Sequence, residues 1–394
     1  MTTLKLRDGI EWVGAIDWDR RLFDELIPLP DGTTYNAYLV RGSEKTALLD
    51  TVDPAFSGVL FEHLRQAGVE KLDYVVAHHA EQDHSGTLPE VLRRFPGARV
   101  VCTLKAMGML MDLLDLPGDR FATVEDGATI PLGGKTLRFI HFPWVHWPET
   151  MVSFLEEDRV LFPCDLFGSH LAQSNLAAEY GAYALLAAKR YYAEIMMPFR
   201  AMIQKNLPRI EALPVELIAP SHGPVVPDPR VIMDAYREWL ADRPHNLAVI
   251  AYTSMHDSTR RMVRYLVDAL AARGVAVEQF NMATADLGKL GIALVDAATL
   301  VLASPTVLGG AHPLVLYAAS VVGVLRPKAK HAAVIGSQGW GGKMAEQLAG
   351  TISVLKAELL EPVLAKGAPK AADFAALDRL ADTIAEKHRG LPGA

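Results

Sequence analysis

The sequence lacks the residues on which disulfide scaffolds, sulfur-ligated metal clusters and nucleic-acid-binding proteins depend. Its 394 residues include only two cysteines, Cys102 and Cys164, too few for a disulfide framework or an iron–sulfur cluster. Acidic residues (46) outnumber basic ones (39), and no stripe of Lys and Arg is present to neutralise phosphates. We therefore expect a reducing compartment, no nucleic-acid partner and a small substrate.

No leader segment is indicated, and long hydrophobic runs are missing. The start, Met1 to Asp8, has no apolar core behind its positive charges, so neither a signal peptide nor a transit peptide is indicated. The longest apolar run, Leu314 to Leu325, is shorter than the roughly 20 residues needed to cross a bilayer, and we interpret it as a buried helix. These features predict a cytoplasmic protein without a membrane partner.

The chain carries two successive patterns and is long enough for two domains of about 100 to 200 residues each. Short apolar runs first alternate with turns, as in stacked strands with interleaved helices. After a helix-breaking segment, Ala241 to Asn246, strands and helices alternate strictly, as in a doubly wound parallel sheet. We predict an α/β protein with domains at 1–245 and 246–394. The expected helices are 54–66, 85–94, 258–273, 313–325 and 371–388, and the later strands are 137–141, 151–155, 160–163, 217–220, 247–251, 275–280, 299–303 and 332–336.

The segment His79-Ala80-Glu81-Gln82-Asp83-His84 predicts a metal site. It follows the apolar stretch from Tyr74 to Ala77, so a strand ending there can project several of these side chains to one side before the chain turns. Imidazoles and carboxylates without sulfur suit zinc, iron or manganese. His84 is the least certain ligand, because Asp83 could serve a second metal while His84 turns outward.

Three later apolar runs also end in ligand-type residues, His146, Asp165 and His222. A lone histidine in such a loop is more often a packing residue than a ligand. Together, however, the candidate ligands exceed the four that one tetrahedral zinc takes, so two metals with a shared ligand are expected. Asp165, with two carboxylate oxygens, is the expected bridge, and His78 and His170 are interpreted as outer or packing residues.

This order of motifs resembles the metallo-β-lactamase superfamily as modified in flavodiiron proteins. Glu81 stands where zinc hydrolases of that superfamily usually carry His, and a harder, more anionic pocket suits iron. The resemblance covers nearly the whole chain and includes the segments 32–39, 190–192 and 197–199. It implies a metallo-β-lactamase-like αββα sandwich followed by a flavodoxin-like doubly wound sheet. It also implies two irons held by His79, Glu81, Asp83, His84, His146, Asp165 and His222.

Three strand-end loops of the second domain predict an FMN site. A hydroxyl-rich loop opens a helix, where backbone N–H groups favour a phosphate, and Trp340 among glycines can stack on an isoalloxazine. The alternative is that these loops only cap helices and that Trp340 fills a core. The candidate residues are Thr253, Ser254, Met255, His256, Asp257, Ser258, Thr259, Pro305, Thr306, Val307, Leu308, Gly309, Ser337, Gln338, Gly339, Trp340, Gly341 and Gly342.

Asp257 departs from the family pattern, since relatives often have Gly there. A carboxylate near a phosphate repels it unless the side chain points to solvent. Asp tolerates left-handed backbone angles, so the shape of the loop can survive. We therefore expect an effect on FMN affinity rather than on FMN identity.

The resemblance implies an oxidoreductase that reduces dioxygen to water, nitric oxide to nitrous oxide, or both, at a diiron centre fed by FMN. Tyr192 is either a hydrogen-bond donor to substrate or a packing residue. A head-to-tail homodimer or dimer of dimers is implied, with the flavin of one protomer against the irons of its partner. Electrons are expected from a separate donor such as a rubredoxin or a flavin reductase. The alternatives are a dinuclear zinc hydrolase with an accessory flavodoxin-like domain and a non-enzymatic flavin electron carrier.

Overall fold

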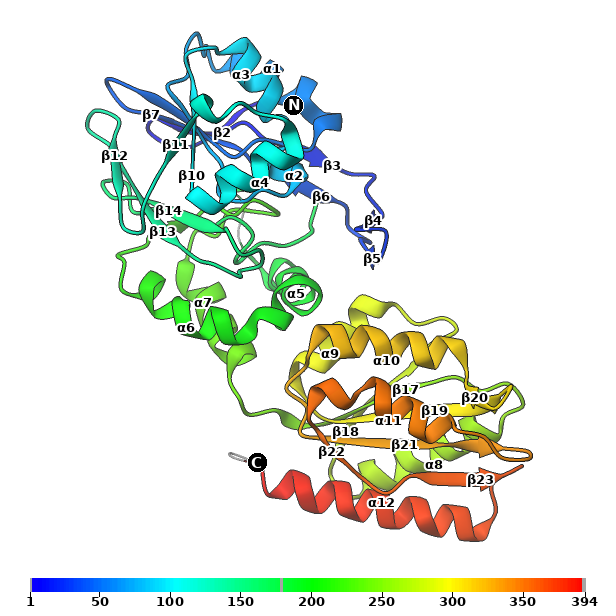
Figure 1. The fold of residues 1–394 in the computed structure, drawn as a ribbon. Helices are drawn as coiled ribbons and strands as arrows, with labels where there is room; N and C mark the ends of the chain where they lie inside the picture. The colour runs from blue at the N-terminus through cyan, green and yellow to red at the C-terminus, as the bar shows by residue number, and fades with distance from the viewer. Residues whose placement is uncertain (1, 178–179, 392–394) are drawn as a thin grey trace. The chain divides into compact units, whose positions relative to one another are not determined.

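The computed structural model describes residues 2–177 and 180–391 (Figure 1). Contacts between Cα atoms group the chain into two compact units. Unit 1 consists of Met1–Tyr192 and Phe199–Leu240, and unit 2 consists of Ala241–Ala394 with Ala193–Pro198. After the short segment Ala193–Pro198, the chain passes to unit 2 between Leu240 and Ala241, and the domain bounds 1–245 and 246–394 stay a prediction.

Unit 1 is built on two β-sheets that face each other. Tyr38 and Val40 of the first sheet pack with Phe139 and Leu155 of the second in one buried cluster. The first sheet has the order β1 (Leu4–Arg7), β2 (Ile10–Trp12), β7 (Tyr38–Arg41), β8 (Thr46–Leu49), β9 (Tyr74–Val76), β10 (Arg99–Cys102) and β11 (Phe121–Thr123). The second has β12 (Thr129–Pro131), β13 (Thr136–His141), β14 (Met151–Leu155), β15 (Val160–Phe162) and β16 (Leu217–Ile218).

Helices cover the outer faces of these sheets. The alternate residues of the first sheet, such as Leu39, Leu48 and Val75, pack in a second cluster with Leu60 and Leu110 of two of its helices, because side chains alternate across a strand. Beyond the second sheet lie α6 and α7 (Figure 1), which completes the expected αββα sandwich. The helices are α1 (Ser57–Gln66), α2 (Gln82–Ser85), α3 (Leu88–Arg94), α4 (Leu104–Leu114), α5 (Ala182–Tyr191), α6 (Arg200–Glu211) and α7 (Pro229–Leu240), with 3₁₀ turns η1 (Pro54–Phe56) and η2 (Gly118–Arg120). A π-helix, η3 (Tyr192–Met196), and a 3₁₀ turn, η4 (Met197–Phe199), follow α5 in the chain, and most of their residues are grouped with unit 2. Two short hairpin-like pairs, β3 (Ala15–Asp17) with β6 (Thr33–Tyr35) and β4 (Leu22–Phe23) with β5 (Ile27–Pro28), complete unit 1.

One predicted helix of unit 1 is wrong in its bounds. The helix expected at 85–94 is two helices, α2 and α3, separated at Gly86 and Thr87. Pro89 has no backbone N–H to continue the hydrogen-bond ladder back to Ser85, so the first helix ends there. As a result, the candidate ligands at 83 and 84 lie within a one-turn helix rather than ahead of one.

Unit 2 is a doubly wound parallel sheet, as the sequence predicts. Its main path runs β18 (Ala276–Asn281), β17 (His245–Tyr252), β19 (Ala297–Val307), β21 (His331–Gln338) and β22 (Glu358–Leu359), with β23 (Val363–Lys366) also beside β21 and β20 (Gly310–Ala311) antiparallel to β19. One face packs on α8 (Ser258–Ala272) and α12 (Ala371–Arg389), and the other on α9 (Leu287–Asp296), α10 (Pro313–Leu325) and α11 (Met344–Thr351). A 3₁₀ turn, η5 (Ser353–Leu355), follows α11. The order places the carboxyl ends of β17, β19 and β21 at one edge, where such sheets bind ligands.

The apolar run from 314 to 325 is α10, whose Val315, Ala319 and Val322 are buried while Val324 is exposed. It is therefore a half-buried surface helix rather than a fully buried one. Among residues 2–177 and 180–391, no helix combines the length and the apolar character that crossing a membrane requires. Both cysteines of the sequence are buried as free thiols.

Candidate functional site

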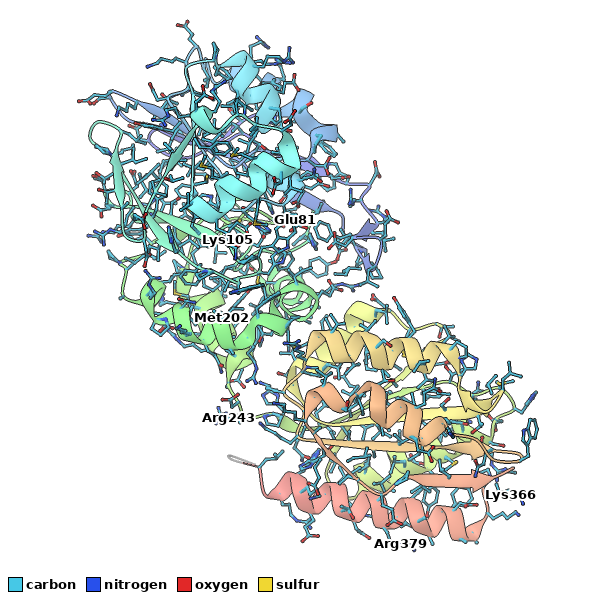
Figure 2. The ribbon with its side chains drawn as sticks, viewed as in Figure 1. Glu81, Lys105, Met202, Arg243, Lys366 and Arg379 are labelled. Atoms are coloured by element: carbon cyan, nitrogen blue, oxygen red, sulfur yellow. The ribbon has the colours of Figure 1, made fainter. Side chains whose placement is uncertain are left out.

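The candidate metal ligands of unit 1 lie in loops that follow strands of its two sheets. His79 and Glu81 follow β9, and Glu81 is labelled in Figure 2. His146 lies between β13 and β14, Asp165 follows β15, and His222 follows β16. Strands that end at the same edge therefore bring residues from distant parts of the sequence into one cluster.

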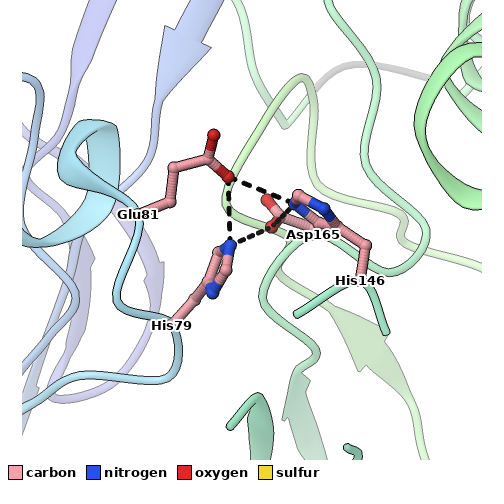
Figure 3. A group of neighbouring side chains, drawn as sticks. All are labelled: His79, Glu81, His146 and Asp165. Atoms are coloured by element: carbon pink, nitrogen blue, oxygen red, sulfur yellow. Dashed lines mark hydrogen bonds and ion pairs between the residues drawn. The ribbon is translucent and has the colours of Figure 1, made fainter. Parts of the chain in front are cut away.

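The first ligand set consists of His79, Glu81, His146 and Asp165 (Figure 3). Glu81 Oε2 lies 3.0 Å from His79 Nε2 and 3.2 Å from His146 Nε2. Asp165 Oδ2 lies 3.7 Å from His79 Nε2 and 3.4 Å from His146 Nε2. All four side chains therefore turn a donor atom toward one point.

The second ligand set consists of Asp83, His84 and His222 and also meets Asp165. Asp165 Oδ1 lies 3.0 Å from His84 Nε2 and 3.4 Å from His222 Nε2. Asp83 Oδ1 lies 3.4 Å from His84 Nε2, and Asp83 Oδ2 lies 3.2 Å from His222 Nε2. His84 thus points into the cluster, and the two oxygens of Asp165 divide between the two sets.

These distances fit metal ions better than they fit hydrogen bonds. Donor atoms held about 2.1 Å from one ion are separated by roughly 3.0 to 3.4 Å, depending on the coordination geometry. All four carboxylate oxygens of Asp83 and Asp165 are buried without a hydrogen-bond partner, which is costly unless a cation is present. Each set offers two imidazoles, one carboxylate and one oxygen of Asp165. This ligand composition is typical of non-haem iron sites with open positions.

The charges of the cluster are strongly coupled. Burial favours the neutral form of Asp165, but His84 and His146 outweigh burial and lower the pKa of this carboxyl well below its usual range. Burial likewise opposes the charged form of His146, yet Asp165 and Glu81 raise the pKa of that imidazole to about 10. The carboxylates are therefore ready to bind a cation, which would displace protons from the imidazoles.

Sequence reasoning missed the groups that orient these ligands. Glu149 Oε1 accepts hydrogen bonds from His79 Nδ1 at 2.7 Å and from the Ala80 N–H at 2.9 Å. The backbone carbonyl of Thr34 accepts one from His222 Nδ1 at 2.6 Å. Bonds of this kind fix which imidazole nitrogen faces a metal. Glu149, three residues after His146, was the one signal in the sequence that could have been used.

A buried chain of side chains lies behind the ligand loops. Asp50 Oδ2 accepts a hydrogen bond from His78 Nδ1 at 2.7 Å, and His78 Nε2 lies 2.8 Å from Ser153 Oγ. Asp50 also accepts a hydrogen bond from the His78 N–H. His78 therefore has the outer role that the sequence indicated, tying the loop of His79 to both sheets.

His170 and Tyr192 lie near the cluster in different ways. The ring of His170 lies 5.1 Å from that of His222 and 4.8 Å from Tyr191, and burial, then the charge of His222, lowers its pKa well below the usual range. Tyr192 instead donates a hydrogen bond to the Trp239 carbonyl at 3.3 Å and packs on Tyr236. The structure thus favours the packing alternative for Tyr192 and brings the neighbouring Tyr191 toward the ligands.

Unit 2 contains the second candidate site, a cavity of about 320 Å³ at the carboxyl edge of its sheet. Lys366, labelled in Figure 2, ends β23 at this edge, and Gly367, which sequence reasoning missed, lines the cavity. The lining consists of Ser254, Met255, His256, Ser258, Thr259, Pro305, Thr306, Ser337, Gln338, Gly339, Trp340 and Gly367. The predicted residues outside this lining are Thr253, Asp257, Val307, Leu308, Gly309, Gly341 and Gly342.

The cavity fits a flavin phosphate ester in three respects. The hydroxyl of Thr306, in the lining, is buried without a hydrogen-bond partner, and such a group favours a polar ligand. The loop from 254 to 258 leads into the N-terminus of α8, which attracts anions. Trp340 is 89% exposed, so it fills no core and its ring can stack on a planar ligand. Gly342 is required because a Cβ there would lie 2.7 Å from the Gly309 carbonyl oxygen.

Known proteins are similar to this chain over most of its length. A family model described as ODP family beta lactamase matches residues 33–223. A nitric oxide reductase of Moorella thermoacetica is 37% identical over 362 residues, 90% of each chain. A coenzyme F420H(2) oxidase of Methanothermobacter marburgensis is 35% identical over 353 residues, 86% of this chain and 87% of the relative.

Solved structures are similar over both units. The rubredoxin oxygen:oxidoreductase of Desulfovibrio gigas is 30% identical, with a TM-score of 0.94 over 98% of this chain and 99% of that chain. The flavodiiron protein of Giardia intestinalis is 26% identical, with a TM-score of 0.91 over 98% of each chain. The similarity therefore spans the ligand cluster and the cavity of unit 2 together.

Proposed function

Because this chain belongs to the flavodiiron protein family, we propose that the two ligand sets joined by Asp165 hold its two irons and that the cavity beside α8 holds its FMN. The chain is an oxidoreductase that reduces dioxygen to water, nitric oxide to nitrous oxide, or both. The bridging position of Asp165, with one oxygen toward each set, is the observation that carries the metal assignment. The domains are assigned accordingly, 1–245 to the irons and 246–394 to FMN.

The protein's own contribution at the metal site is to hold ligands and exclude water. His79, His84, Asp165 and His222 have side chains no more than 1% exposed, whereas His146 is 13% and Glu81 16% exposed. The gas is therefore proposed to enter on the side of Glu81 and His146. When bound, two ferrous irons can give two electrons and reduced FMN two more, which matches the four that dioxygen needs and exceeds the two that nitric oxide coupling needs.

We also propose which kind of protein donates the electrons and how the protomers assemble. A rubredoxin or a flavin reductase is the proposed donor, in keeping with the rubredoxin oxygen:oxidoreductase among the similar solved structures. The proposed assembly is a head-to-tail homodimer in the cytoplasm. Dilution to monomers should then abolish turnover while iron and FMN stay bound, and full activity in a proven monomer would refute the dimer.

The metal and flavin assignments are tested together by anaerobic reconstitution with ferrous salt and FMN. We expect two irons and one FMN per chain, and reoxidation of the reduced protein by dioxygen or nitric oxide in stopped flow. Asp165→Asn should lose most of the iron and the gas reaction yet retain FMN. Two zincs, no iron and ester hydrolysis without a reductant would instead support the zinc hydrolase. Unchanged function in His79→Asn would support a simple electron carrier.

A further inference from the structure

The loop that leads into α8 contains an aspartate in an unusual position. Asp257 precedes the first residue of the helix with left-handed backbone angles, φ 68° and ψ −13°, and its carboxylate makes no capping hydrogen bond. Its neighbours His256 and Ser258 line the cavity of unit 2, whereas Asp257 itself does not. The carboxylate therefore lies outside the place where a ligand would sit.

An aspartate before a helix normally accepts hydrogen bonds from the first turn and satisfies its N–H groups. Here the carboxylate is turned toward Arg260, with Oδ1 3.4 Å from an Arg260 guanidinium nitrogen. The two side chains are 51% and 39% exposed, so the contact lies at the surface. The Arg260 N–H donates to Ser254 Oγ at 3.2 Å, which closes the loop across its base.

The surroundings of this loop point to an anionic ligand independently of the helix end. The hydroxyl of Thr306 is buried without a hydrogen-bond partner. Thr306 lines the cavity, and Thr259, also in the lining, lies 3.2 Å from Ser337 through its hydroxyl. The hydroxyls of Thr259, Thr306 and Ser337, from three separate elements, thus line a cavity beside a helix N-terminus that its own aspartate does not cap.

We propose that Asp257 and Arg260 form a charge-compensating pair that sets the affinity of this cavity for the phosphate of FMN. The proposal rests on the proposed function only for the identity of the ligand. The pair carries no net charge, so its two opposite charges largely cancel at the phosphate dianion and hold the affinity between those of the two single variants. Loss of Arg260 leaves a net negative charge beside the phosphate, and loss of the Asp257 charge leaves a positive one.

The experiment measures FMN and riboflavin binding to the full-length, flavin-stripped protein by fluorescence quenching at low ionic strength. Riboflavin has the ring without the phosphate, so it reports loop shape and stacking alone. We expect Arg260→Gln to weaken FMN binding and Asp257→Asn to tighten it, each by roughly three- to tenfold, the size of a single charge in a half-exposed setting. The double variant should return to within about twofold of the wild type.

Two controls isolate the charge effect. Arg264→Gln removes an exposed arginine one turn further along α8 and should leave FMN binding unchanged. High salt should shrink the differences among the variants, because it screens exposed charges. Riboflavin binding should be equal in every variant.

Three results would overturn the proposal. A double variant as weak as Arg260→Gln would mean that the arginine acts on the phosphate alone. Parallel changes in riboflavin binding would mean that the substitutions alter the fold of the loop. Equal FMN affinity in all variants would mean that the pair is electrostatically irrelevant. If the wild type itself binds no flavin, the proposed function fails, which is distinguishable because no variant is needed to observe it.

Discussion

Glu149 shows how one residue outside the ligand sets can control them. Its carboxylate is fully buried, holds His79 Nδ1 through Oε1, and has a second oxygen without a hydrogen-bond partner. Because His79 outweighs burial, the pKa of Glu149 lies below its usual range. The charge therefore stays in place to orient the imidazole.

Glu149→Gln should lower the iron affinity of the first ligand set about 10- to 100-fold, the range seen when such supporting groups are removed. Competition with a chelator of known affinity measures the change. Glu156→Gln, at a surface pair with Arg138, is a matched control and should behave as the wild type. Equal iron affinity in both variants would contradict an orienting role for Glu149.

The sequence leaves Tyr192 either a substrate-binding or a packing role, and the structure favours the packing role. Its hydroxyl contacts the Trp239 carbonyl and its ring packs on Tyr236 and Trp239. Tyr192→Phe should cost about 1 kcal/mol of unfolding free energy for the lost hydrogen bond and leave the rate of gas reduction unchanged. Denaturant unfolding and stopped flow measure the two quantities. A slower gas reaction at unchanged stability would restore Tyr192 as a substrate ligand.

At the level of elements, the helix bounds of unit 2 could be predicted closely, because apolar periodicity and helix-ending residues are local features of the sequence. The helix expected at 313–325 has those bounds in the structure, and the one expected at 258–273 ends at Ala272 before Gly274, whose φ is +76°. Residues such as Gly288 and Gly291 explain why α9 was not foreseen, since glycine lowers helix propensity. Its stability comes from packing on the sheet, which a single sequence does not display.

The residues of the ligand cluster could be predicted from the sequence, but their division between the two ligand sets could not. Ligand-type side chains after apolar runs predict that the residues meet at strand ends. Which oxygen of Asp165 serves which set, and that Asp83 pairs with His84 and His222, depend on tertiary geometry. Glu149 and Gly367 were missed because their roles arise only when separate loops come together.

His388 predicts how the attachment of α12 depends on pH. Its ring is buried between Thr299 of β19, at 2.7 Å, and Asn246 of β17, at 2.8 Å. Asn246 donates to the Gly274 carbonyl through its amide nitrogen, so its oxygen faces His388 and receives the Nδ1 hydrogen of a neutral ring. Burial, then the charge of His331, lowers the pKa of His388 from 6.5 to about 4.

Since the unfolded chain binds this proton first, stability should fall as the pH drops from about 6.5 toward 4. Between pH 7 and pH 5 the loss from this group is about 2 kcal/mol. His388→Gln should be less stable at pH 7 but lose correspondingly less on acidification, as measured by denaturant unfolding at both pH values. His245→Gln, at a half-exposed position of β17, is the control. An identical pH dependence in the wild type and His388→Gln would contradict this role.

At the level of the whole molecule, the two compact units each carry one proposed cofactor site. A ligand that binds only the folded form stabilises it by about 2.7 kcal/mol at one hundred times its dissociation constant. Calorimetry should therefore show one transition that shifts with ferrous ion and another that shifts with FMN. Chelation of iron should lower only the first. A single transition shifted equally by both additions would show that the units unfold together.

The burial of both cysteines has a consequence for an enzyme that handles oxidising gases. Sulfenic acid formation needs an accessible thiolate, whereas burial raises the pKa of Cys102 to about 12 and leaves Cys164 1% exposed. Peroxide released by incomplete turnover should therefore oxidise an exposed methionine thioether before it oxidises either cysteine thiol. Met255, 53% exposed beside the flavin cavity, is positioned to become a sulfoxide first, so ageing of the working enzyme should begin at its cofactor pocket.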